Sequence, residues 1–482
     1  MIPFGPLESD GSTFDPAISR RAENVQPKKD GWGPFPAHNP LSSALASTCY
    51  GGYTTLNSND THAIFAGTTT GLYKYNTGTL GWDDFTTTAT TYALPSQNYW
   101  SMHQWGDNLL AGNSSDGLYK LDLLSGTEFT AVSAAPAAKF YSNIGNYVVA
   151  GNINGQPTRL QWSEFNDVDS WTTGEGGAGF QDLADGGEIR GIIKGELGAF
   201  VLQQRAIQRM TFEGGEWVFS IDKSMEQRGC AAPGSLVNAG EDGFFFLDTD
   251  GFYRYGPGGI APIGAEKENR TLLGEMDLDL IYTVQGAADP INKMVWWIVP
   301  KSDGTKYMLG YDWQLGRWAR VEDEMDFLFS AATPAMTLAA IAALWPTLSS
   351  VPYPFGSRVW KGGQPTFAAV DTDNKMGYFA GTNMQATLET ADIAHAGAGA
   401  RSFVNGYRII TDASGHTGQV GVKDNHSDTI SWDTATSPDS NTGLIPARAN
   451  GKLHRYRGII AAGEDWDTIH GVEPVVRRAG RR

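Results

Sequence analysis

A unit of roughly forty residues recurs about six times between residues 46 and 325. Most copies combine a short apolar strand, a Gly-rich turn, an alternating strand and a strand that carries Trp or another aromatic residue. Two clear copies read THAIFAGTTTGLYKYNTGTLGWDDF from Thr61 and WGDNLLAGNSSDGLYKLDLLSGTEF from Trp105. Self-similarity at this period, with several strands in each copy, is typical of a β-propeller. The sequence therefore predicts an all-β chain with a roughly six-bladed β-propeller over residues 46–325.

The strand assignment rests on period-two patterning between turns. In GLYKY, Leu72 and Lys74 are predicted on one face of a strand, and Tyr73 and Tyr75 on the other. The tetrapeptides SSDG, GEDG, DTDG and KSDG are typical of hairpin turns, where Gly supplies the positive φ that tight turns require. Short strands joined by tight turns agree with the propeller.

The flanking regions predict three further parts. Residues 1–45 are rich in Pro, Asp and Ser and predict an extended N-terminal arm, which would either close a blade or reach a neighbouring subunit. Residues 326–357 predict an insert with an Ala-rich helix at 335–345, which is about half of the roughly 20 residues that span a bilayer. We expect this helix to be buried or to dock, with membrane insertion as the alternative. Residues 358–482 resume alternating strands and predict a C-terminal β-sandwich, although 358–380 could also belong to the propeller.

Charge is unevenly distributed along the chain. The net charge is −17, which argues against adhesion to nucleic acid or to an anionic membrane by simple attraction. Residues 401–482 hold 11 Lys/Arg against 9 Asp/Glu, a net charge of +2, which leaves −19 for residues 1–400. The basic end VVRRAGRR is either a solvated tail or a contact with an acidic neighbour. Only Cys49 and Cys230 are present, and no secretory signal is visible, so we expect folding in a reducing cytoplasm.

Catalytic, cofactor-binding and metal-ligating patterns are not found in the sequence, and we predict none of these residues and no cofactor. The eight histidines form no pair with metal-ligand spacing: His38, His62, His103, His395, His416, His426, His454 and His470. A glycosidase would need paired carboxylates, and the acidic groups available are Asp83/Asp84, Glu241/Asp242 and Glu322/Asp323/Glu324. These groups lie in turn-like stretches, where solvated loops are expected.

Four tryptophans fall late in their repeats: Trp82, Trp171, Trp217 and Trp318. We expect them to pack between blades, and an aromatic platform for sugars is the alternative. The Trp-Asp dipeptide occurs at Trp82, Trp432 and Trp466, but not at the repeat period, so a WD-repeat scaffold is not favoured.

The order of the parts resembles a known family. A Pro-rich arm (AENVQPKKDGWGPFP) precedes blades that carry GLYK at Gly71 and Gly117 and the segment LQWSEFNDVDSWTTG. A strand-rich end follows, with GYFAGTNMQATLET and RYRGIIAAGEDWDTIHGVEPVVRRAGRR. Over nearly the whole chain, this arrangement is similar to the tail nozzle protein of short-tailed bacteriophages, also called the tail hub or DNA-stabilisation protein.

The resemblance implies a structural virion component and not an enzyme. It would form a homo-hexameric ring in the virion tail, below the portal and its adaptor (head-to-tail connector) ring, after assembly in the host cytoplasm. The genome would be retained by this ring and ejected through its channel without sequence-specific binding. A tail needle or spike would close the open end, and tail fibres are further candidate partners.

Elementary electrostatics is compatible with that implication. Lys/Arg contacts that release counterions make DNA adhere, so an acidic lumen would let it slide. We expect the propeller's own channel to be too narrow for a duplex, so that DNA would pass between subunits. The alternative function is a carbohydrate-binding or glycan-cleaving propeller in the tail.

Overall fold

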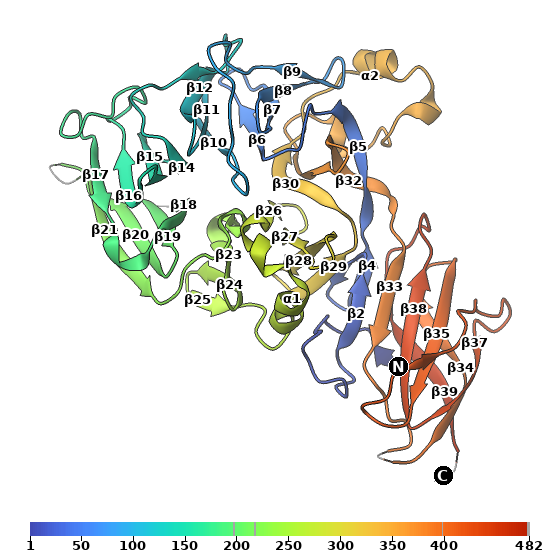
Figure 1. Cartoon of the computed structure of the whole chain (residues 1–482). Helices are drawn as coiled ribbons and strands as arrows, with labels where there is room; N and C mark the ends of the chain where they lie inside the picture. The colour runs from blue at the N-terminus through green and yellow to red at the C-terminus, as the bar shows by residue number, and fades with distance from the viewer. Residues whose placement is uncertain (196–197, 216–217, 398, 480–482) are drawn as a thin grey trace.

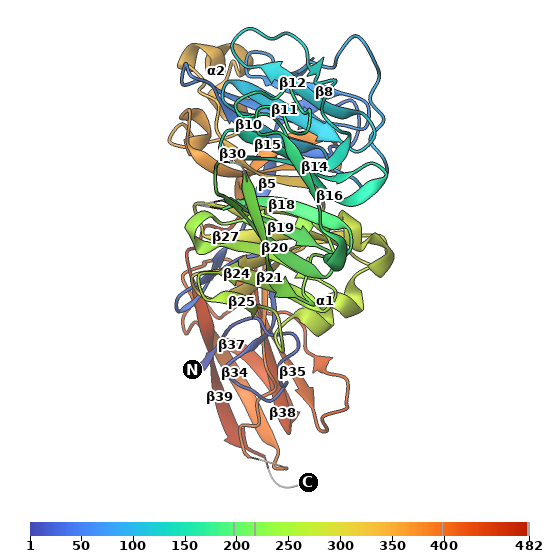
Figure 2. The same ribbon diagram turned by 90° about the vertical axis from the view of Figure 1, so that its left-hand side faces the viewer.

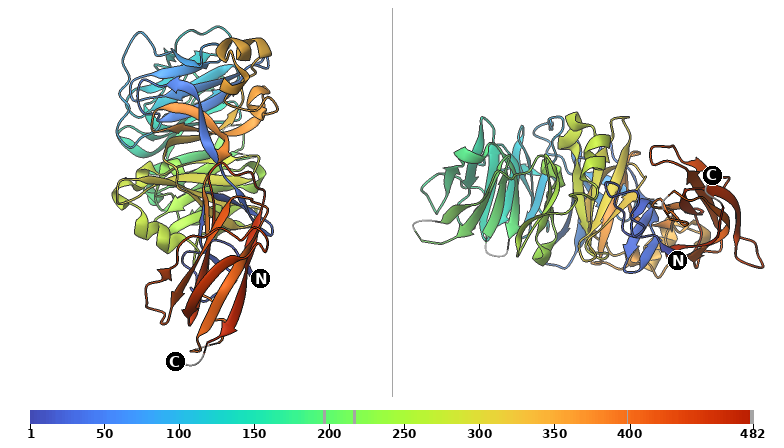
Figure 3. Two further views of the ribbon diagram at one scale, coloured as in Figure 1. Left: turned by 90° about the vertical axis from the view of Figure 1, so that its right-hand side faces the viewer. Right: turned by 90° about the horizontal axis from the view of Figure 1, so that it is seen from below.

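The chain forms a β-propeller joined to a β-sandwich (Figure 1). The computed structural model describes residues 1–195, 198–215, 218–397 and 399–479. Views from the side and from below show the sandwich as an extension at the rim of the propeller disc, which leaves both faces of the disc uncovered by it (Figures 2 and 3). The predicted all-β propeller and C-terminal sandwich are therefore confirmed.

The propeller has seven blades of four antiparallel strands, and the innermost strand β30 contacts both β26 and β6, which closes the ring. Blades one and two contain β6 (Gly51–Leu56), β7 (His62–Gly67), β8 (Leu72–Asn76), β9 (Gly81–Asp84), β10 (Ser101–Trp105), β11 (Asn108–Asn113), β12 (Gly117–Asp122) and β13 (Thr130–Ala131). Blades three and four contain β14 (Ala138–Ile144), β15 (Tyr147–Ile153), β16 (Gln156–Trp162), β17 (Gly179–Asp182), β18 (Ile189–Gly195), β19 (Gly198–Gln203), β20 (Ala206–Phe212) and β21 (Phe219–Glu226). Blades five and six contain β22 (Val237–Asn238), β23 (Phe244–Asp248), β24 (Gly251–Gly256), β25 (Gly259–Pro262), β26 (Gln285–Asp289), β27 (Met294–Pro300), β28 (Lys306–Asp312) and β29 (Arg317–Val321).

The second strand of a blade reads as a nearly continuous apolar run because both of its faces are covered. In β27, MVWWIVP, every residue is buried. Trp297 stacks on Phe252 of blade five, with ring centroids 4.0 Å apart, while Trp296 meets Phe35 of the N-terminal arm at 5.0 Å. Short apolar runs bounded by turns are the expected pattern of strands buried on both sides. Packing between blades, rather than within one sheet, therefore holds the ring together.

Blade seven is assembled from two distant parts of the chain. Its inner strands are β30 (Met325–Ala332), β31 (Pro365–Asp371) and β32 (Lys375–Asn383), and its outermost strand is β5 (Pro36–Ala44) from the N-terminus. The prediction of about six blades was one short because no continuous forty-residue unit encodes this blade. The sequence left open whether residues 358–380 belong to the sandwich or to the propeller, and the hairpin β31–β32 belongs to the propeller.

Residues 333–364 form an insertion between β30 and β31, so the predicted insert 326–357 begins within β30. The insertion holds helix α2 (Leu338–Leu344), at the upper right of Figure 1. The side chain of Thr337 caps α2 by accepting a hydrogen bond from the N–H of Ala340. Ile341 is buried against blade seven, whereas Leu338 is 72% exposed. The predicted helix therefore packs on the propeller by one face only.

The sandwich consists of two sheets, and its C-terminal part begins at residue 386. The first contains β2 (Ser19–Glu23), β33 (Ala386–Thr390), β38 (Leu453–Ile460), β35 (His416–Lys423) and β36 (Ser431–Trp432). The second contains β3 (Val25–Lys28), β4 (Gly31–Pro34), β39 (Ile469–Arg478), β34 (Ser402–Thr411), β37 (Ile445–Gly451) and β1 (Ile2–Pro3), which pairs with β39. Aromatic and aliphatic side chains such as Tyr407, Tyr456 and Val472 fill the space between the sheets.

Few helices accompany these strands. Helix α1 (Asn269–Glu275) follows blade five, and short 3-10 turns are at Ala184–Gly186, Pro233–Ser235, Gly240–Asp242, Leu278–Thr283, Leu348–Ser350 and Arg358–Trp360. Among the described residues, no helix has the length and apolar character needed to cross a bilayer.

The N-terminal arm, residues 1–45, is part of both domains. It contributes β1–β4 to the sandwich and β5 to the propeller. Strand β2 pairs in parallel with β29 of blade six, at Glu23 and Arg320, and antiparallel with β33 of the sandwich. Blade six and the first sandwich sheet are therefore one continuous nine-stranded sheet. The arm therefore closes a blade, which is one of the two roles that the sequence predicted for it.

The role of β5 can be tested by cavity formation. Leu41 lies in β5, is 6% exposed and belongs to the apolar cluster between blades seven and one. We expect Leu41→Ala to lower the free energy of unfolding by ~2–5 kcal/mol, because a buried leucine leaves a cavity when truncated. Leu56→Ala, at a 43% exposed position in β6, is the matched control and should cost less than ~1 kcal/mol. Chemical denaturation measures both, and equal effects would contradict the placement of β5.

Candidate functional site: the axial cavity and the propeller–sandwich junction

The innermost strands of the propeller surround a cavity of about 640 Å³ on the propeller axis. Its wall includes Ser101, His103, Lys139, Tyr141, Ser142, Arg190, Ile192, Tyr282, Gln285 and Phe327, contributed by β10, β14, β18, β26, β30 and the turn before β26. Pockets of ~300–1,000 Å³ are the usual size for small-molecule ligands. The cavity is therefore far too small to hold a DNA duplex.

The side chain of Arg190 makes an ion pair, a hydrogen bond and a cation–π contact at this cavity. It lies at a bulge in the pairing of β18 with β19, and such an irregularity re-aims a side chain. Its guanidinium is 2.6 Å from Glu188 Oε1, donates to the Tyr282 hydroxyl at 3.0 Å and lies over the Tyr282 ring. Asn152 donates to the second oxygen of Glu188 at 3.3 Å. Arg190 therefore ties blades three and four to the turn that precedes blade six.

Two further polar side chains line the cavity. Lys139 has no ion-pair partner among the residues that the structure describes. Burial lowers the pKa of His103 to about 4, so its imidazole is neutral at pH 7. The described part of the cavity wall thus carries two cations, one carboxylate and a neutral histidine, an arrangement of the size and polarity that a small polar ligand requires.

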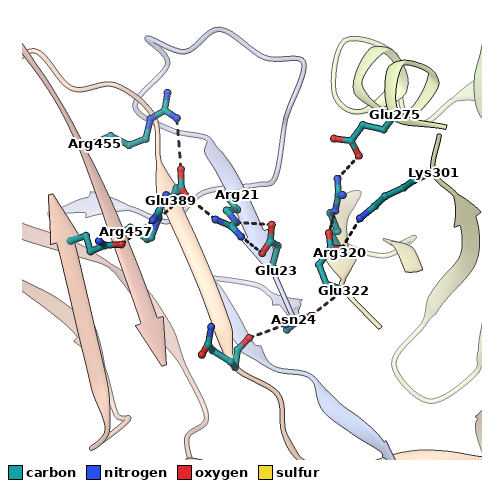
Figure 4. A network of polar contacts seen from close by, with 12 residues as sticks. Arg21, Glu23, Asn24, Glu275, Lys301, Arg320, Glu322, Glu389, Arg455 and Arg457 are labelled. Atoms are coloured by element: carbon teal, nitrogen blue, oxygen red, sulfur yellow. Dashed lines mark hydrogen bonds and ion pairs between the residues drawn. The ribbon is translucent and has the colours of Figure 1, made fainter. Parts of the chain in front are cut away.

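The second candidate region is the junction between propeller and sandwich, where β29, β2, β33 and β38 lie side by side (Figure 4). On the propeller side, Arg320 of β29 pairs with Glu275 at 2.8 Å and with Glu322 at 2.5 Å. The Arg320 guanidinium also lies 4.1 Å from the centroid of the Tyr307 ring. Lys301 pairs with the other oxygen of Glu322 at 2.9 Å. Helix α1 and blade six are joined in this way.

On the sandwich side, Glu389 of β33 forms ion pairs with three arginines. Arg457 approaches it at 2.7 Å, Arg21 at 3.5 Å and Arg455 at 3.7 Å, and Arg21 also pairs with Glu23 at 2.6 Å (Figure 4). The side chain of Glu389 is only 8% exposed. One buried carboxylate cannot balance three guanidinium groups. Glu23 therefore also pairs with Arg21, and Asp392 pairs with Arg455 at 2.9 Å.

Asn24 bridges the two halves of this network. Its backbone N–H donates to the Arg320 carbonyl at 2.8 Å, and its side-chain oxygen accepts from the N–H of Glu322 at 2.9 Å. Its side-chain amide donates to the carbonyl of Gln385 at 2.9 Å. Asn24 has a φ of 59°, a left-handed conformation that Asn tolerates better than most residues. The turn between β2 and β3 is therefore fixed to both domains.

Beneath these polar contacts the core is continuous. One apolar cluster includes Phe245 of blade five, Trp296 and Trp318 of blade six, and Leu388 and Tyr456 of the sandwich. Individual surface ion pairs contribute little, typically 0–1 kcal/mol. The shared apolar core is therefore the larger contribution, and the polar network fixes the register of β2 between its neighbours.

The residues singled out from sequence are scattered over this structure. Glu322 belongs to the junction, Asp242 accepts hydrogen bonds from Arg254 and Trp313, and Asp83 accepts from Asn76. None of the three acidic groups lines the axial cavity. No group of three or more His, Cys, Asp or Glu residues in the described part of the chain is arranged to hold a metal ion.

The described tryptophans of this set pack against other residues and form no exposed aromatic surface. Trp171 and Trp318 are 4% and 1% exposed, and their indole N–H groups donate to the carbonyls of Val168 and Ile263. Trp82 is half-buried and donates to the Ser43 carbonyl of β5. The fourth, Trp217, lies outside the described residues. Blade packing explains the three tryptophans that can be seen.

Neither the junction nor Arg190 was predicted from the sequence. The junction residues come from segments separated by up to several hundred positions, so no local motif contains them. Only the alternation of charged and apolar residues in HRYRGII, from His454, hinted that Arg455 and Arg457 share one face of a strand.

Comparisons with known proteins give a fold-level likeness only. No protein-family model and no curated protein matches the chain. Among solved structures, BamB from Moraxella catarrhalis has a TM-score of 0.37 and 11% identity, covering 73% of this chain and 92% of BamB. BBS1N, solved in complex with ARL6DN, has a TM-score of 0.40 and 10% identity, with coverage of 72% and 96%. The Neurospora crassa Pan2 WD40 domain has a TM-score of 0.41 and 8% identity, with coverage of 70% and 94%.

Truncation of Arg320 tests the junction. We expect Arg320→Ala to lower the free energy of unfolding by ~1–3 kcal/mol, because it leaves Glu275 and Glu322 without their main partner and uncovers the Tyr307 ring. Arg270→Ala is the control, since its pair with Glu266 is exposed and should contribute at most ~1 kcal/mol. Denaturant titrations of the two variants would contradict the account if Arg270 proved as costly as Arg320.

Glu268 predicts a pH dependence of stability. Burial raises its pKa to about 7, although the N–H of Ser9 in the arm donates to its carboxylate at 2.9 Å. The folded state thus binds a proton more tightly than the unfolded chain, whose glutamate has a pKa near 4.5. Stability from this group is fully present below pH 4.5 and is lost as the pH rises through 7.

Glu268→Gln removes this titration. We expect the variant to match the parent protein at pH 4.5 and to be more stable than the parent at pH 8, as measured by denaturant unfolding at both pH values. A variant that is less stable than the parent at pH 8 would show that the ionised carboxylate is instead favourable in the fold.

Proposed function

We propose that this chain is the subunit of a phage tail nozzle, a structural virion component that forms a ring below the portal and adaptor ring of a short-tailed bacteriophage. The observation that carries the proposal is the order of parts, in which an arm, a propeller and a sandwich occur in the sequence that resembles this family. The arm joins the other two parts into one body through β2 and β5. A fixed angle between two domains is what a subunit of a closed ring needs.

The dimensions and charge of the propeller support a conduit between copies. The axial cavity, at about 640 Å³, accepts a small molecule and not a duplex, so the genome would pass through the lumen of the ring instead. Residues 1–400 carry a net charge of −19. A lumen lined by such a surface would have few of the Lys/Arg contacts that release counterions and make DNA adhere.

The proposed partners follow from that position. The ring would contact the adaptor on one side and a tail needle or spike on the other, with tail fibres on its flank. The DNA would be retained and then ejected without sequence-specific contacts. A glycan-binding propeller is less well supported, because Trp171 and Trp318 are buried and offer no exposed platform.

The mass of the protein in solution tests the proposal. We expect light scattering to detect a ring of about six chains, either for the purified protein or after addition of the adaptor ring from the same phage. A glycan array with the free chain is the companion measurement. A monomer under both conditions, together with specific glycan binding, would replace the nozzle with the carbohydrate-binding alternative.

A further inference from the structure

The outer sheet of the sandwich displays a basic surface on an acidic protein. In this sheet, Val404 of β34 opposes Ala449 of β37 and Val476 of β39, and all three side chains face the core or pack against it. Their neighbours in sequence therefore face outward, because side chains alternate along a strand. The outward set contains three exposed arginines, one on each strand: Arg408, Arg448 and Arg477.

The three arginines share this surface with apolar side chains. Val475 is 46% exposed, Pro446 is exposed, and Phe403 is half-buried directly opposite Arg477. We call the six residues Phe403, Arg408, Pro446, Arg448, Val475 and Arg477 the arginine face. A combination of exposed arginine with aromatic and aliphatic groups is typical of protein interfaces.

The arginines of this face have no carboxylate partner within 4 Å among the described residues. Arg408 donates only to the carbonyl of Thr442, although Glu473 lies opposite it in the next strand. Several other basic residues of the sandwich are paired. Arg401 pairs with Asp424, Lys423 with Asp392, and Arg457 with Glu389. Three cations without a described carboxylate partner thus lie together on the outward face.

We propose that the arginine face docks on the acidic propeller of a second copy of this chain. The propeller, residues 35–385, holds 21 Lys/Arg against 37 Asp/Glu and carries −16, so docking of the arginine face on a propeller joins opposite charges. The sandwich as a whole, residues 1–34 and 386–482, is close to neutral at −1. A contact between two arginine faces or between two propellers would join like charges. Docking of the arginine face on a propeller is heterologous, since two different surfaces meet, and heterologous contacts generate rings when the rotation closes. This inference rests on the proposed ring and identifies the surface that would build it.

A second copy fits this face better than a nucleic acid does. Duplex binding relies on many Lys/Arg contacts to phosphate, and this face offers three arginines together with Glu473. The apolar area of Val475, Phe403 and Pro446 would gain nothing from a phosphate backbone, but it is buried favourably against another protein surface. The arginine face is therefore assigned to protein docking.

Charge reversal tests the assignment. The variant Arg408→Glu/Arg448→Glu/Arg477→Glu is compared with Lys194→Glu/Arg205→Glu/Arg209→Glu, which changes the net charge equally at exposed positions of blade four. Sedimentation velocity and light scattering, at low and high salt and with or without the adaptor ring, report the assembly. We expect the first variant to weaken assembly about tenfold or more, and the control to assemble like the parent protein. High salt should weaken the parent assembly as well.

Other outcomes overturn the inference in distinguishable ways. If the parent forms rings and both variants do so equally well, the docking surface is wrong while the ring proposal stands. If the parent stays monomeric even with the adaptor, the proposed function fails and the inference fails with it. If the parent binds duplex DNA and only the first variant loses that binding, the face is a nucleic-acid surface. Circular dichroism checks folding, and the neutral variant Arg408→Gln/Arg448→Gln/Arg477→Gln replaces the first one if reversal prevents folding.

Discussion

Strand β2 holds this molecule together, because it pairs with β29 of the propeller on one side and with β33 of the sandwich on the other. The next strands of the same segment complete the second sandwich sheet, and β5 then closes blade seven. The first 45 residues therefore pair with strands from residues 317 to 478. Neither domain is complete until the N-terminal strands have paired with their partner strands. Propeller closure and sandwich formation are therefore coupled.

This coupling has a functional consequence for a subunit that must fix its neighbours at a defined angle. A flexible linker between two domains would let their relative orientation vary, whereas a continuous nine-stranded sheet with a shared apolar core does not. The acidic surface and the arginine face are therefore held in a fixed relative position. An acidic propeller and a sandwich with unpaired outward arginines are held at opposite ends of one body, an arrangement that suits head-to-tail assembly.

Local patterns in the sequence predicted the local structure well. GLYK and its neighbours predicted strands, and the apolar runs predicted blade packing, since Leu72 and Tyr75 are both buried between blades. Blade seven was not predictable because β5 and β32 lie more than three hundred positions apart, and a period search sees only contiguous units. The junction was missed for the same reason, as Asn24, Arg320 and Glu389 share no local motif. Arg190 depends on a bulge in the strand pairing, which the sequence around it does not reveal.

Electron cryomicroscopy of the assembled protein tests the central claim most directly, namely that a rigid propeller–sandwich body builds a ring by head-to-tail contacts. The account predicts a closed ring in which each sandwich lies against the next propeller, with a lumen between copies and β2 continuous with both of its partner strands. A ring whose propeller axes themselves form the channel, or particles in which sandwich and propeller adopt variable angles, would contradict it.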